Sequence, residues 1–271
     1  MGRRRPDRQL GHGLLLPGPS NSVDHPRSHR GPARPLQLCA LDCSIGEHTW
    51  TAALESVAIA QTAAQRVADG ERSAFALCRP PGHHATRDQF GGYYLNNSAA
   101  AARRLRAQGF AKVGIIVSTI TTATAPGHLF TNGAMWSCVD PTVILASGSR
   151  SSSATPTRPA RAKVSRANFS AIRCLAAFEL GAWMAAFESA MADLTAAGVE
   201  ALVVSLGVDT YTGDPISDFQ LDIGDYPTIG KQLAGLGLPT VFVMEGGYAT
   251  AELGGNIVGV LQGFEGAAFL S

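Results

Sequence analysis

The sequence predicts an α/β protein in which helices flank a parallel β-sheet. Short apolar segments without polar alternation recur between longer segments that have the periodicity of amphipathic helices. Strands that are apolar on both faces are typical of parallel sheets covered by helices. In such sheets the functional site lies at the carboxyl ends of the strands, so the polar segments that follow the strands are the first candidates for a site.

The first half of the chain predicts two pairs of a helix and a strand. Residues 49–70 have helical periodicity and stop at Gly70, and residues 73–78 form a short apolar strand. Residues 96–109 begin with two asparagines and end at a glycine, which predicts a second helix. The segment KVGII at 112–116 then begins a buried strand.

The second half repeats this alternation. Residues 183–198 predict a helix, and residues 201–209 predict a buried strand that ends in a polar loop. Residues 228–237 predict another helix, followed at 239–248 by a second buried strand and a glycine turn. A last helix is expected at about 250–264.

Two segments depart from the pattern. Residues 1–38 are rich in Arg, Pro, Gly, His and Ser, which favours an irregular or disordered arm before a single domain at 39–271. Within that domain, residues 117–180 are of low complexity, rich in Ser, Thr, Ala and Arg, and show no period. We therefore expect one central strand region of the sheet to be disrupted.

The composition is that of an ordinary soluble enzyme, with 45% hydrophobic residues, 16% charged residues and a net charge of +1. This charge favours neither nucleic acid nor a membrane surface as a partner. No run approaches the roughly 18 apolar residues of a spanning helix. The stretch after the basic N-terminus is too short and proline-broken for a signal peptide, so we expect a cytoplasmic protein. Five cysteines without two close pairs indicate reduced thiols.

The first polar cluster after a strand is RPPGHHATRDQFGGYYLNN at 79–97. It places His83 and His84 on a turn that two prolines and a glycine keep out of a helix. One neutral imidazole can take a proton from water near pH 7, and a second can hold charge or donate to a leaving group. A single histidine in a loop would be interpreted as a surface residue without function. The whole segment 79–97 instead favours a functional site.

The other two clusters carry an acid and a phenol. Asp209, in SLGVDTYTGDP at 205–215, follows an apolar strand, where a carboxylate is costly unless it is paired or bound to a cation. In MEGGY at 244–248 two glycines allow a sharp turn, from which Tyr248 can project a phenol that stabilises an oxyanion. Alone, Asp209 is equally compatible with a helix cap and Tyr248 with a core residue; the three clusters together favour a site.

Taken in order, RPPGHHA, GGYYLNN, SLGVDTYTGDP and EGGY resemble the histone deacetylase superfamily, most closely its bacterial acetylpolyamine amidohydrolases. The resemblance covers roughly residues 40–116 and 180–268. It implies an arginase-like α/β fold, a catalytic Zn²⁺, and hydrolysis of an N-acetyl amide, in an acetylpolyamine or acetyl-lysine, to acetate and amine. A homodimer is common among such amidohydrolases, and the residues leave the oligomeric state open.

The resemblance also implies roles for single residues. His83 and His84 match the family's histidine pair, of which one is the general base and the other an acid or electrostatic partner. Asp209 matches one zinc ligand, and Tyr248 matches the tyrosine that polarises the acetyl carbonyl. The channel for the acylated substrate is matched by Gly92 and Tyr93.

The motif that supplies the other two zinc ligands, close to D-x-D-x-H-H-G-N-G-T, should follow KVGII but is absent. Thr119 and Thr121 stand where the Asp and His ligands belong, and threonine is not a usual zinc ligand. Val117 stands in place of an Asp that would orient a catalytic histidine. A catalytic zinc needs about three protein ligands and an open position, so Asp209 alone cannot hold it tightly.

Two functions therefore compete: a zinc-dependent deacetylase, and a catalytically inactive remnant that is either a binding module or an unstable product. A metal-independent hydrolase is the weakest alternative, because no serine or cysteine nucleophile motif accompanies the histidines. By resemblance alone, the sequences of the motifs GVDTYTGDP and GGYYLNN favour small acetylated amines over histone tails as the substrate.

A one-base shift of the reading frame would account for the missing motif. Residues 119–126 can be encoded by ACT ATC ACC ACG GCA ACG GCA CCC, and the same letters read one base earlier spell Asp-Tyr-His-His-Gly-Asn-Gly-Thr. We predict that the gene carries this motif in the shifted frame near codons 117–126 and returns to frame before about codon 181. Sequencing codons 110–185 tests this, and a shifted frame without the motif would refute it.

Overall fold

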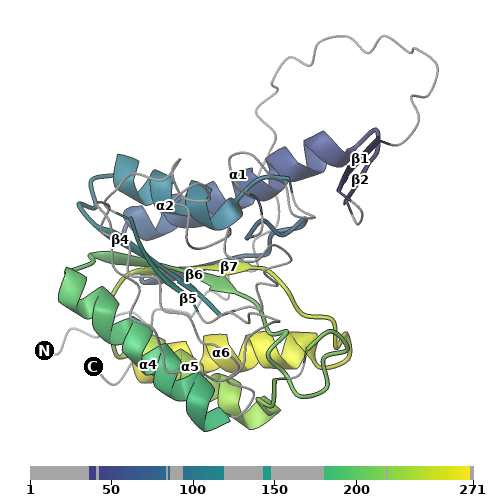
Figure 1. Ribbon diagram of the computed structural model, residues 1–271. Helices are drawn as coiled ribbons and strands as arrows, with labels where there is room; N and C mark the ends of the chain where they lie inside the picture. The colour runs from purple at the N-terminus through teal and green to yellow at the C-terminus, as the bar shows by residue number, and fades with distance from the viewer. Residues whose placement is uncertain are drawn as a thin grey trace, which may run out of the picture. The chain divides into compact units, whose positions relative to one another are not determined.

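A five-stranded parallel β-sheet between two layers of helices dominates the described part of the protein (Figure 1). The structure is a computed structural model that describes residues 37–40, 43–83, 85, 94–118, 143–147, 180–217 and 219–268. The chain divides into the units Met1–Pro35 and Leu36–Ser271, and every described residue belongs to the second. The arm predicted at 1–38 therefore lies outside the described residues, except for its last two.

The sheet consists of β3 (Ser73–Ala76), β4 (Val113–Val117), β5 (Val143–Ser147), β6 (Ala201–Leu206) and β7 (Thr240–Met244). The strands lie in the order β3-β7-β6-β4-β5, and all four pairings are parallel. Every residue of β4 and β6 is buried, as expected for strands covered on both faces. The predicted parallel α/β architecture is confirmed.

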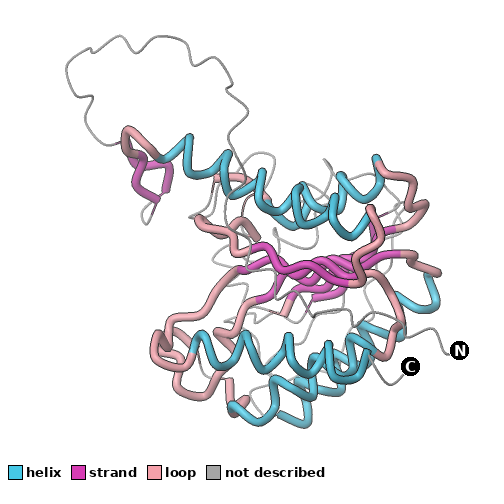
Figure 2. Tube along the Cα trace, turned by 180° about the vertical axis from the view of Figure 1, so that it is seen from behind, coloured by secondary structure: helices cyan, strands magenta, loops and turns pink. Residues whose placement is uncertain are grey.

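Helices cover both faces of the sheet, and the views from the front and from behind agree on the two layers (Figures 1 and 2). One layer contains α1 (Thr49–Ala68) and α2 (Asn97–Ala107), and the other contains α4 (Leu180–Ala197), α5 (Tyr226–Ala234) and α6 (Leu253–Ala268). The shorter elements are the antiparallel hairpin of β1 (Gln37–Ala40) and β2 (Cys43–Ile45) and the 3₁₀ turn η1 (Ile223–Asp225). No described helix has the length and apolar character needed to span a bilayer.

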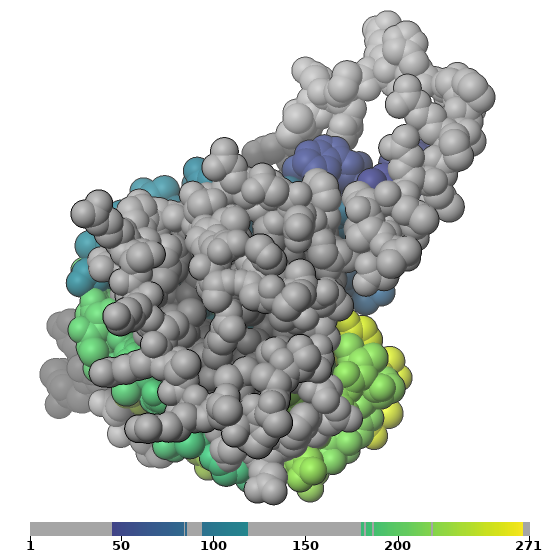
Figure 3. All heavy atoms as spheres, in the orientation of Figure 1, coloured from purple at the N-terminus to yellow at the C-terminus, as the bar shows by residue number. Residues whose placement is uncertain are grey.

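Each layer buries its own core against the sheet. The core under α1 and α2 is built from small side chains, among them Ala60, Ala63 and Ala101, which let the helices approach the strands closely. The opposite core combines aliphatic with larger aromatic side chains, and Trp183 stacks on Phe187 with ring centroids 5.0 Å apart. In the space-filling view, green to yellow residues of α4 and the segments after it lie in the lower part of the molecule (Figure 3).

The ends of α1 and α2 follow the sequence signals. Gly70 and Gly109 have φ angles of 106° and 105°, in the left-handed region that favours glycine, and they end the two helices as predicted. The side chain of Asn96 caps α2 by accepting a hydrogen bond from the backbone N–H of Ala99 at 2.9 Å.

The strand β5 was not anticipated. It lies within the low-complexity segment 117–180, where the sequence predicted no element, and it pairs in parallel with β4 from Val113↔Val143 to Val117↔Ser147. Its sequence, VILAS, is apolar and begins with two β-branched residues, which suit a pleated surface. Five residues are too few for a periodic pattern to identify a strand. The segment is a strand because it pairs with β4, and this pairing cannot be seen in the local sequence.

The helices α5 and α6 pack through glycines, which yields a test of the fold. A Cβ atom at Gly263 would meet the backbone of Pro227, which cannot move aside as a flexible side chain could. We predict that Gly263→Ala lowers the free energy of unfolding by about 1–3 kcal/mol. Gly266→Ala, in open space on the same helix, should instead raise it by about 0.4–1 kcal/mol. Urea denaturation measures both, and equal effects of the two variants would contradict this packing.

Candidate functional site

The three predicted polar clusters follow neighbouring strands at one edge of the sheet. His83 lies beyond the end of β3, Tyr248 beyond β7 and Asp209 beyond β6, and these strands are adjacent in the order β3-β7-β6. Because the three strands are parallel, their carboxyl ends lie at the same edge. The sheet thus gathers segments that are far apart in the sequence.

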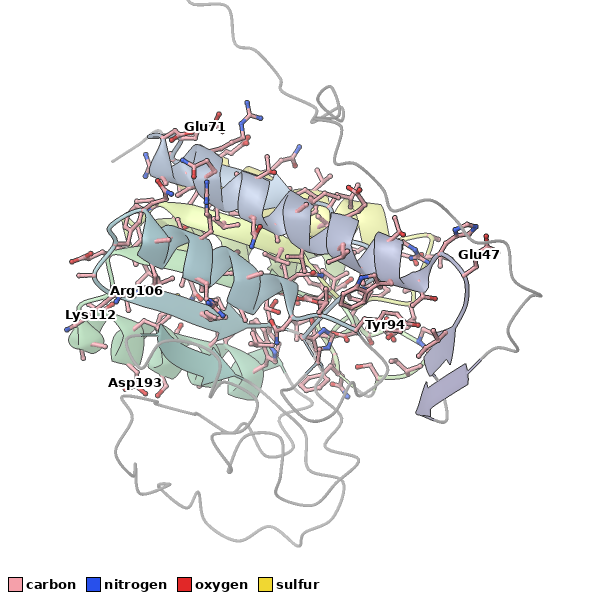
Figure 4. The ribbon with its side chains drawn as sticks, turned by 90° about the horizontal axis from the view of Figure 1, so that it is seen from above. Glu47, Glu71, Tyr94, Arg106, Lys112 and Asp193 are labelled. Carbon is pink, nitrogen blue, oxygen red and sulfur yellow. The ribbon has the colours of Figure 1, made fainter. Side chains whose placement is uncertain are left out.

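The opposite edge of the sheet has a different character. Viewed from above, Arg106 and Lys112 lie together at one end, whereas Tyr94, beside the start of α2, lies towards the other (Figure 4). Arg106 donates to the carbonyl oxygens of Phe110 and Ala111, and Lys112 donates to that of Ala197 at 2.8 Å. These contacts join the chain segments around the amino ends of the strands. We therefore interpret Arg106 and Lys112 as residues that stabilise the fold.

The turn that carries His83 is held by both helices of its layer. The carbonyl oxygen of Pro80 accepts hydrogen bonds from Ser56 Oγ at 2.7 Å and from Asn97 Nδ2 at 3.0 Å. Gly82 lies so close to the start of α2 that an added Cβ would meet the carbonyl oxygen of Leu95. This close approach explains why a glycine precedes the histidines.

The carboxylate of Glu245, directly after β7, pairs with His83. Its Oε2 lies 3.1 Å from His83 Nδ1 and accepts the backbone N–H groups of Gly82 at 2.8 Å and His83 at 3.2 Å. The other oxygen, Oε1, accepts the hydroxyls of Ser98 and Ser205, both at 3.1 Å. The side chains of Glu245 and His83 are 0% and 3% exposed, so this is a fully buried pair.

The surroundings of Glu245 keep it ionised. Burial by itself raises the pKa of this carboxyl, but the hydrogen bond and charge of His83, together with the donors from Gly82 and Ser98, hold the pKa below its ordinary value. A carboxyl whose pKa is lower in the folded than in the unfolded state stabilises the fold above its unfolded pKa. That stabilisation is lost as the pH falls through the folded pKa.

Asp209 follows β6 in a buried segment. Asp209 and Thr210 are each 2% exposed, and Thr210 Oγ1 lies 3.3 Å from the phenol oxygen of Tyr226. The Tyr226 phenol donates to the carbonyl oxygen of Val208 at 3.2 Å. Burial, supplemented by the charges of nearby aspartates including Asp209, raises the pKa of Tyr226, so it stays protonated as a donor that fixes the loop.

Asp214 holds the turn that carries Tyr248. Its Oδ2 accepts the backbone N–H groups of Tyr248 at 2.6 Å and Ala249 at 3.3 Å, and its Oδ1 accepts that of Ile216 at 3.1 Å. Gly247, at φ 143°, permits the turn, and a Cβ there would lie 2.9 Å from Val208 Cγ2. Asp214 is buried whereas Tyr248 is 43% exposed, so the backbone of the turn is fixed while the phenol reaches solvent.

The structure therefore locates part of the predicted site. His83, Asp209 and Tyr248 follow the carboxyl ends of adjacent strands, and their chemical roles stay predictions. The predicted positions that lie outside the described residues are His84, Gly92, Tyr93, Thr119 and Thr121. Val117, where the resemblance expects a histidine-orienting Asp, is a buried apolar residue of β4.

Sequence reasoning did not single out Glu245 or Asp214. Both stand inside quoted motifs, and Glu245 directly follows a buried strand, where an acid is costly unless it is paired. That signal could have identified Glu245 as a paired group. Its partner, 162 residues away along the chain, could not be read from the pattern.

The described residues do not fit a catalytic zinc. They contain no group of three or more His, Cys, Asp or Glu side chains that could hold a metal ion. A tetrahedral catalytic site uses three protein ligands and one water. Of the expected ligand positions, Asp209 alone falls within the described part of the chain.

Comparison with known proteins gives a consistent set of relatives. The family model of the histone deacetylase domain matches residues 20–117 and 150–263, and the unmatched residues 118–149 lie within the low-complexity segment. Acetylpolyamine amidohydrolase 1 of Pseudomonas aeruginosa is 40% identical over 235 residues, which are 81% of this chain and 64% of that protein. Acetylpolyamine amidohydrolase of Mycoplana ramosa is 37% identical over 230 residues, covering 84% and 67%. The chain thus spans about two thirds of the length of these relatives.

The chain is also similar to solved structures, one of which is an acetylpolyamine aminohydrolase like the relatives above. The crystal structure of acetylpolyamine aminohydrolase from Burkholderia pseudomallei superposes with a TM-score of 0.71 at 32% identity, covering 83% of this chain and 66% of that one. The crystal structure of the HDA15 HD domain gives a TM-score of 0.72 at 22% identity, covering 86% and 67%, which bears on the fold alone.

The contacts of Asp214 generate a second test. In Asp214→Asn one oxygen becomes an NH₂ group, which cannot accept the backbone N–H groups that now face it. We predict a loss of about 1–3 kcal/mol in the free energy of unfolding. The amides of Tyr248 and Ala249 should also exchange faster with deuterium.

Asp222→Asn is the matched control for this variant. Asp222 caps η1 by accepting the N–H of Ile223 at 2.7 Å in an exposed position, and asparagine caps about as well as aspartate. The free energy of unfolding of the Asp222→Asn variant should barely change. Equal losses in the two variants, or unchanged exchange at Tyr248 and Ala249, would show that Asp214 does not hold the turn.

Proposed function

Since this chain belongs to the histone deacetylase family and has its arginase-like α/β fold, we propose that it hydrolyses N-acetyl amides in small acetylated amines. Four curated relatives at 34–40% identity are named acetylpolyamine amidohydrolases, which supports this substrate class. The observation in this chain that carries the proposal is the buried pair of His83 and Glu245 at the edge where Asp209 and Tyr248 also follow their strands.

The proposed reaction consumes one water molecule. Water adds to the acetyl carbonyl carbon, the bond from that carbon to the amine nitrogen breaks, and the products are acetate and the protonated amine. His83, with Nδ1 held by Glu245, is suited to accept the proton of water at Nε2 and to pass it to the leaving nitrogen. We assign His84 as its acid or electrostatic partner.

Two further groups complete the proposed site. The Tyr248 phenol would donate a hydrogen bond to the carbonyl oxygen as negative charge develops on it, which stabilises the tetrahedral intermediate. Its partial exposure leaves it accessible to a substrate that arrives from solvent. Gly92 and Tyr93 are proposed to line the channel for the amine chain.

Zn²⁺ is the cofactor that we propose from the family, where it would polarise the carbonyl, with Asp209 as one ligand. The described residues do not fit this ion, so no step is assigned to it. We also propose a single deacetylase-like domain at 39–271 that acts in the cytoplasm on a small acetylated amine or acetyl-lysine. Neither nucleic acid nor a membrane is a proposed partner, and a homodimer is the assembly to test.

An inactive family member, acting as a binding module or no longer functional, is the second candidate. The observation that favours it is the presence of Thr119 and Thr121 where the family resemblance expects two zinc ligands. Threonine is not a usual zinc ligand.

Zinc content and acetate release separate the two candidates. For the chain as written, a hydrolase predicts about one zinc per chain and acetate release from N-acetylputrescine or an acetyl-lysine peptide, whereas an inactive family member predicts neither. The chain with its reading frame restored over 117–180 should bind about one zinc and turn over the acetylated amine. Thr119→Asp with Thr121→His should recover part of the zinc binding. Mass spectrometry of bound metal and an acetate assay give the readouts.

The matched control introduces the same two residue types elsewhere. Thr51 and Thr62 are exposed on α1, so Thr51→Asp with Thr62→His should recover neither zinc nor activity. A frame-restored chain that holds zinc but releases no acetate would overturn the proposed hydrolase. Turnover by the chain as written would overturn the inactive remnant.

A further inference from the structure

We propose that Glu245 is the positioning residue of His83, fixing the imidazole as the tautomer that carries its hydrogen on Nδ1 and presents Nε2 as the base. This inference deepens the proposed function and rests on it for its catalytic meaning. The structural part, the tautomer of a buried histidine, stands on the contacts of the two side chains alone.

The carboxylate of Glu245 is surrounded by groups that can donate hydrogen bonds to it. An ionised carboxylate accepts hydrogen bonds and donates none, and its two oxygens offer about four lone-pair positions. Five groups surround Glu245: two backbone N–H groups, two serine hydroxyls and the imidazole Nδ1. The two backbone N–H groups can only donate and the serine hydroxyls can donate, so an ionised carboxylate can accept at each of these contacts, whereas a proton on the carboxyl would take up one of its accepting positions. The environment therefore selects the ionised form.

The imidazole ring of His83 contacts this carboxylate through Nδ1. Since the carboxylate accepts, Nδ1 at 3.1 Å must donate, so the neutral imidazole carries its hydrogen there. Nε2 then has the lone pair that a general base needs. An imidazole in the opposite tautomer would place two lone pairs against each other inside a buried pair, which is strongly unfavourable.

Val117 does not replace Glu245 as the acid beside His83. Val117 is apolar and buried, so it cannot fill the role of the acid that the resemblance expects in its place. Among the described residues, the carboxylate in contact with His83 Nδ1 is that of Glu245. It also binds the backbone of the same turn, through Gly82 and His83, so ring and backbone are fixed by one group. A ring held at both points keeps Nε2 in one direction.

A purely structural role for Glu245 is the competing explanation, because the backbone and serine contacts would hold the turn without the imidazole. The two explanations differ in what they predict for the ring. If Glu245 positions the ring, the His83 imidazole must be in the Nδ1–H form, and this preference must be lost when Glu245 is removed. If Glu245 has a structural role only, the tautomer of the His83 imidazole should not depend on this carboxylate.

The test is long-range ¹H–¹⁵N NMR of the full chain, labelled at histidine, at a pH where imidazole is neutral. His83→Gln assigns the His83 signal by its disappearance. We expect the Nδ1–H tautomer in the unmodified chain, whereas isolated histidine prefers Nε2–H. A His83 ring in the Nε2–H form would overturn the inference without any variant, so failure of a variant to fold cannot leave it undecided.

Three variants then separate positioning from structure. In Glu245→Gln the amide oxygen can face the three N–H donors while its NH₂ group donates to Ser98 and Ser205, so the Nδ1–H form should persist. In Glu245→Ala the preference should shift to Nε2–H. Ser205→Ala removes a donor from Oε1 only and should leave the tautomer unchanged. An identical response of the ring to Glu245→Ala and Ser205→Ala would contradict the proposal.

Turnover adds a readout that depends on the proposed function. In the chain that carries Thr119→Asp and Thr121→His and keeps Val117, Glu245→Ala should lower kcat by about tenfold or more with little change in KM, because His83 then loses the group that fixes its tautomer and stabilises its imidazolium. Ser205→Ala, which leaves the carboxylate and its contact with Nδ1 in place, should lower kcat less than Glu245→Ala does. If the tautomer results hold but no variant or parent releases acetate, the proposed hydrolase fails while the positioning of His83 stands. If acetate is released but kcat is unchanged in Glu245→Ala, the inference fails and the hydrolase stands.

Discussion

The buried carboxylate of Glu245 constrains the candidate site more than any other described group. A charge removed from water must have its lone pairs filled by protein donors, or its desolvation destabilises the fold. The donors come from the turn after β3, from the start of α2 and from β6, while Glu245 itself follows β7. Withdrawal of any one segment would leave a buried charge with fewer partners, so the four segments are fixed together.

The order of the strands makes this network possible. Because β7 lies between β3 and β6, a side chain just beyond its end can reach the segments on either side. Asp214 repeats the principle from the loop after β6, since it binds the backbone that carries Tyr248 after β7. Each of the two loops that carry a predicted catalytic group is thus held by a buried carboxylate from a neighbouring loop. Tyr248 itself is 43% exposed on this fixed backbone.

The sequence predicted what local patterns encode and missed what depends on pairing. The strands β6 and β7 and the stops at Gly70 and Gly109 could be predicted because apolar runs and left-handed glycines are local signals. The motif order predicted the family, which the comparisons confirm. The strand β5 depends on hydrogen bonds to β4, and the partner of Glu245 on a contact across 162 residues, so neither could be derived from neighbouring residues.

The described contacts divide the candidate site into two parts with different origins. The groups that hold His83 and the Tyr248 turn come from residues 82, 98, 205, 214 and 245, all outside the low-complexity segment. The expected metal ligands, apart from Asp209, fall at Thr119 and Thr121 inside it. A change confined to that segment can therefore remove zinc ligands without removing any partner of Glu245 or Asp214. The histidine turn and the tyrosine turn depend on the sheet and on two buried carboxylates, whereas catalysis also depends on a ligand set that the sheet does not provide.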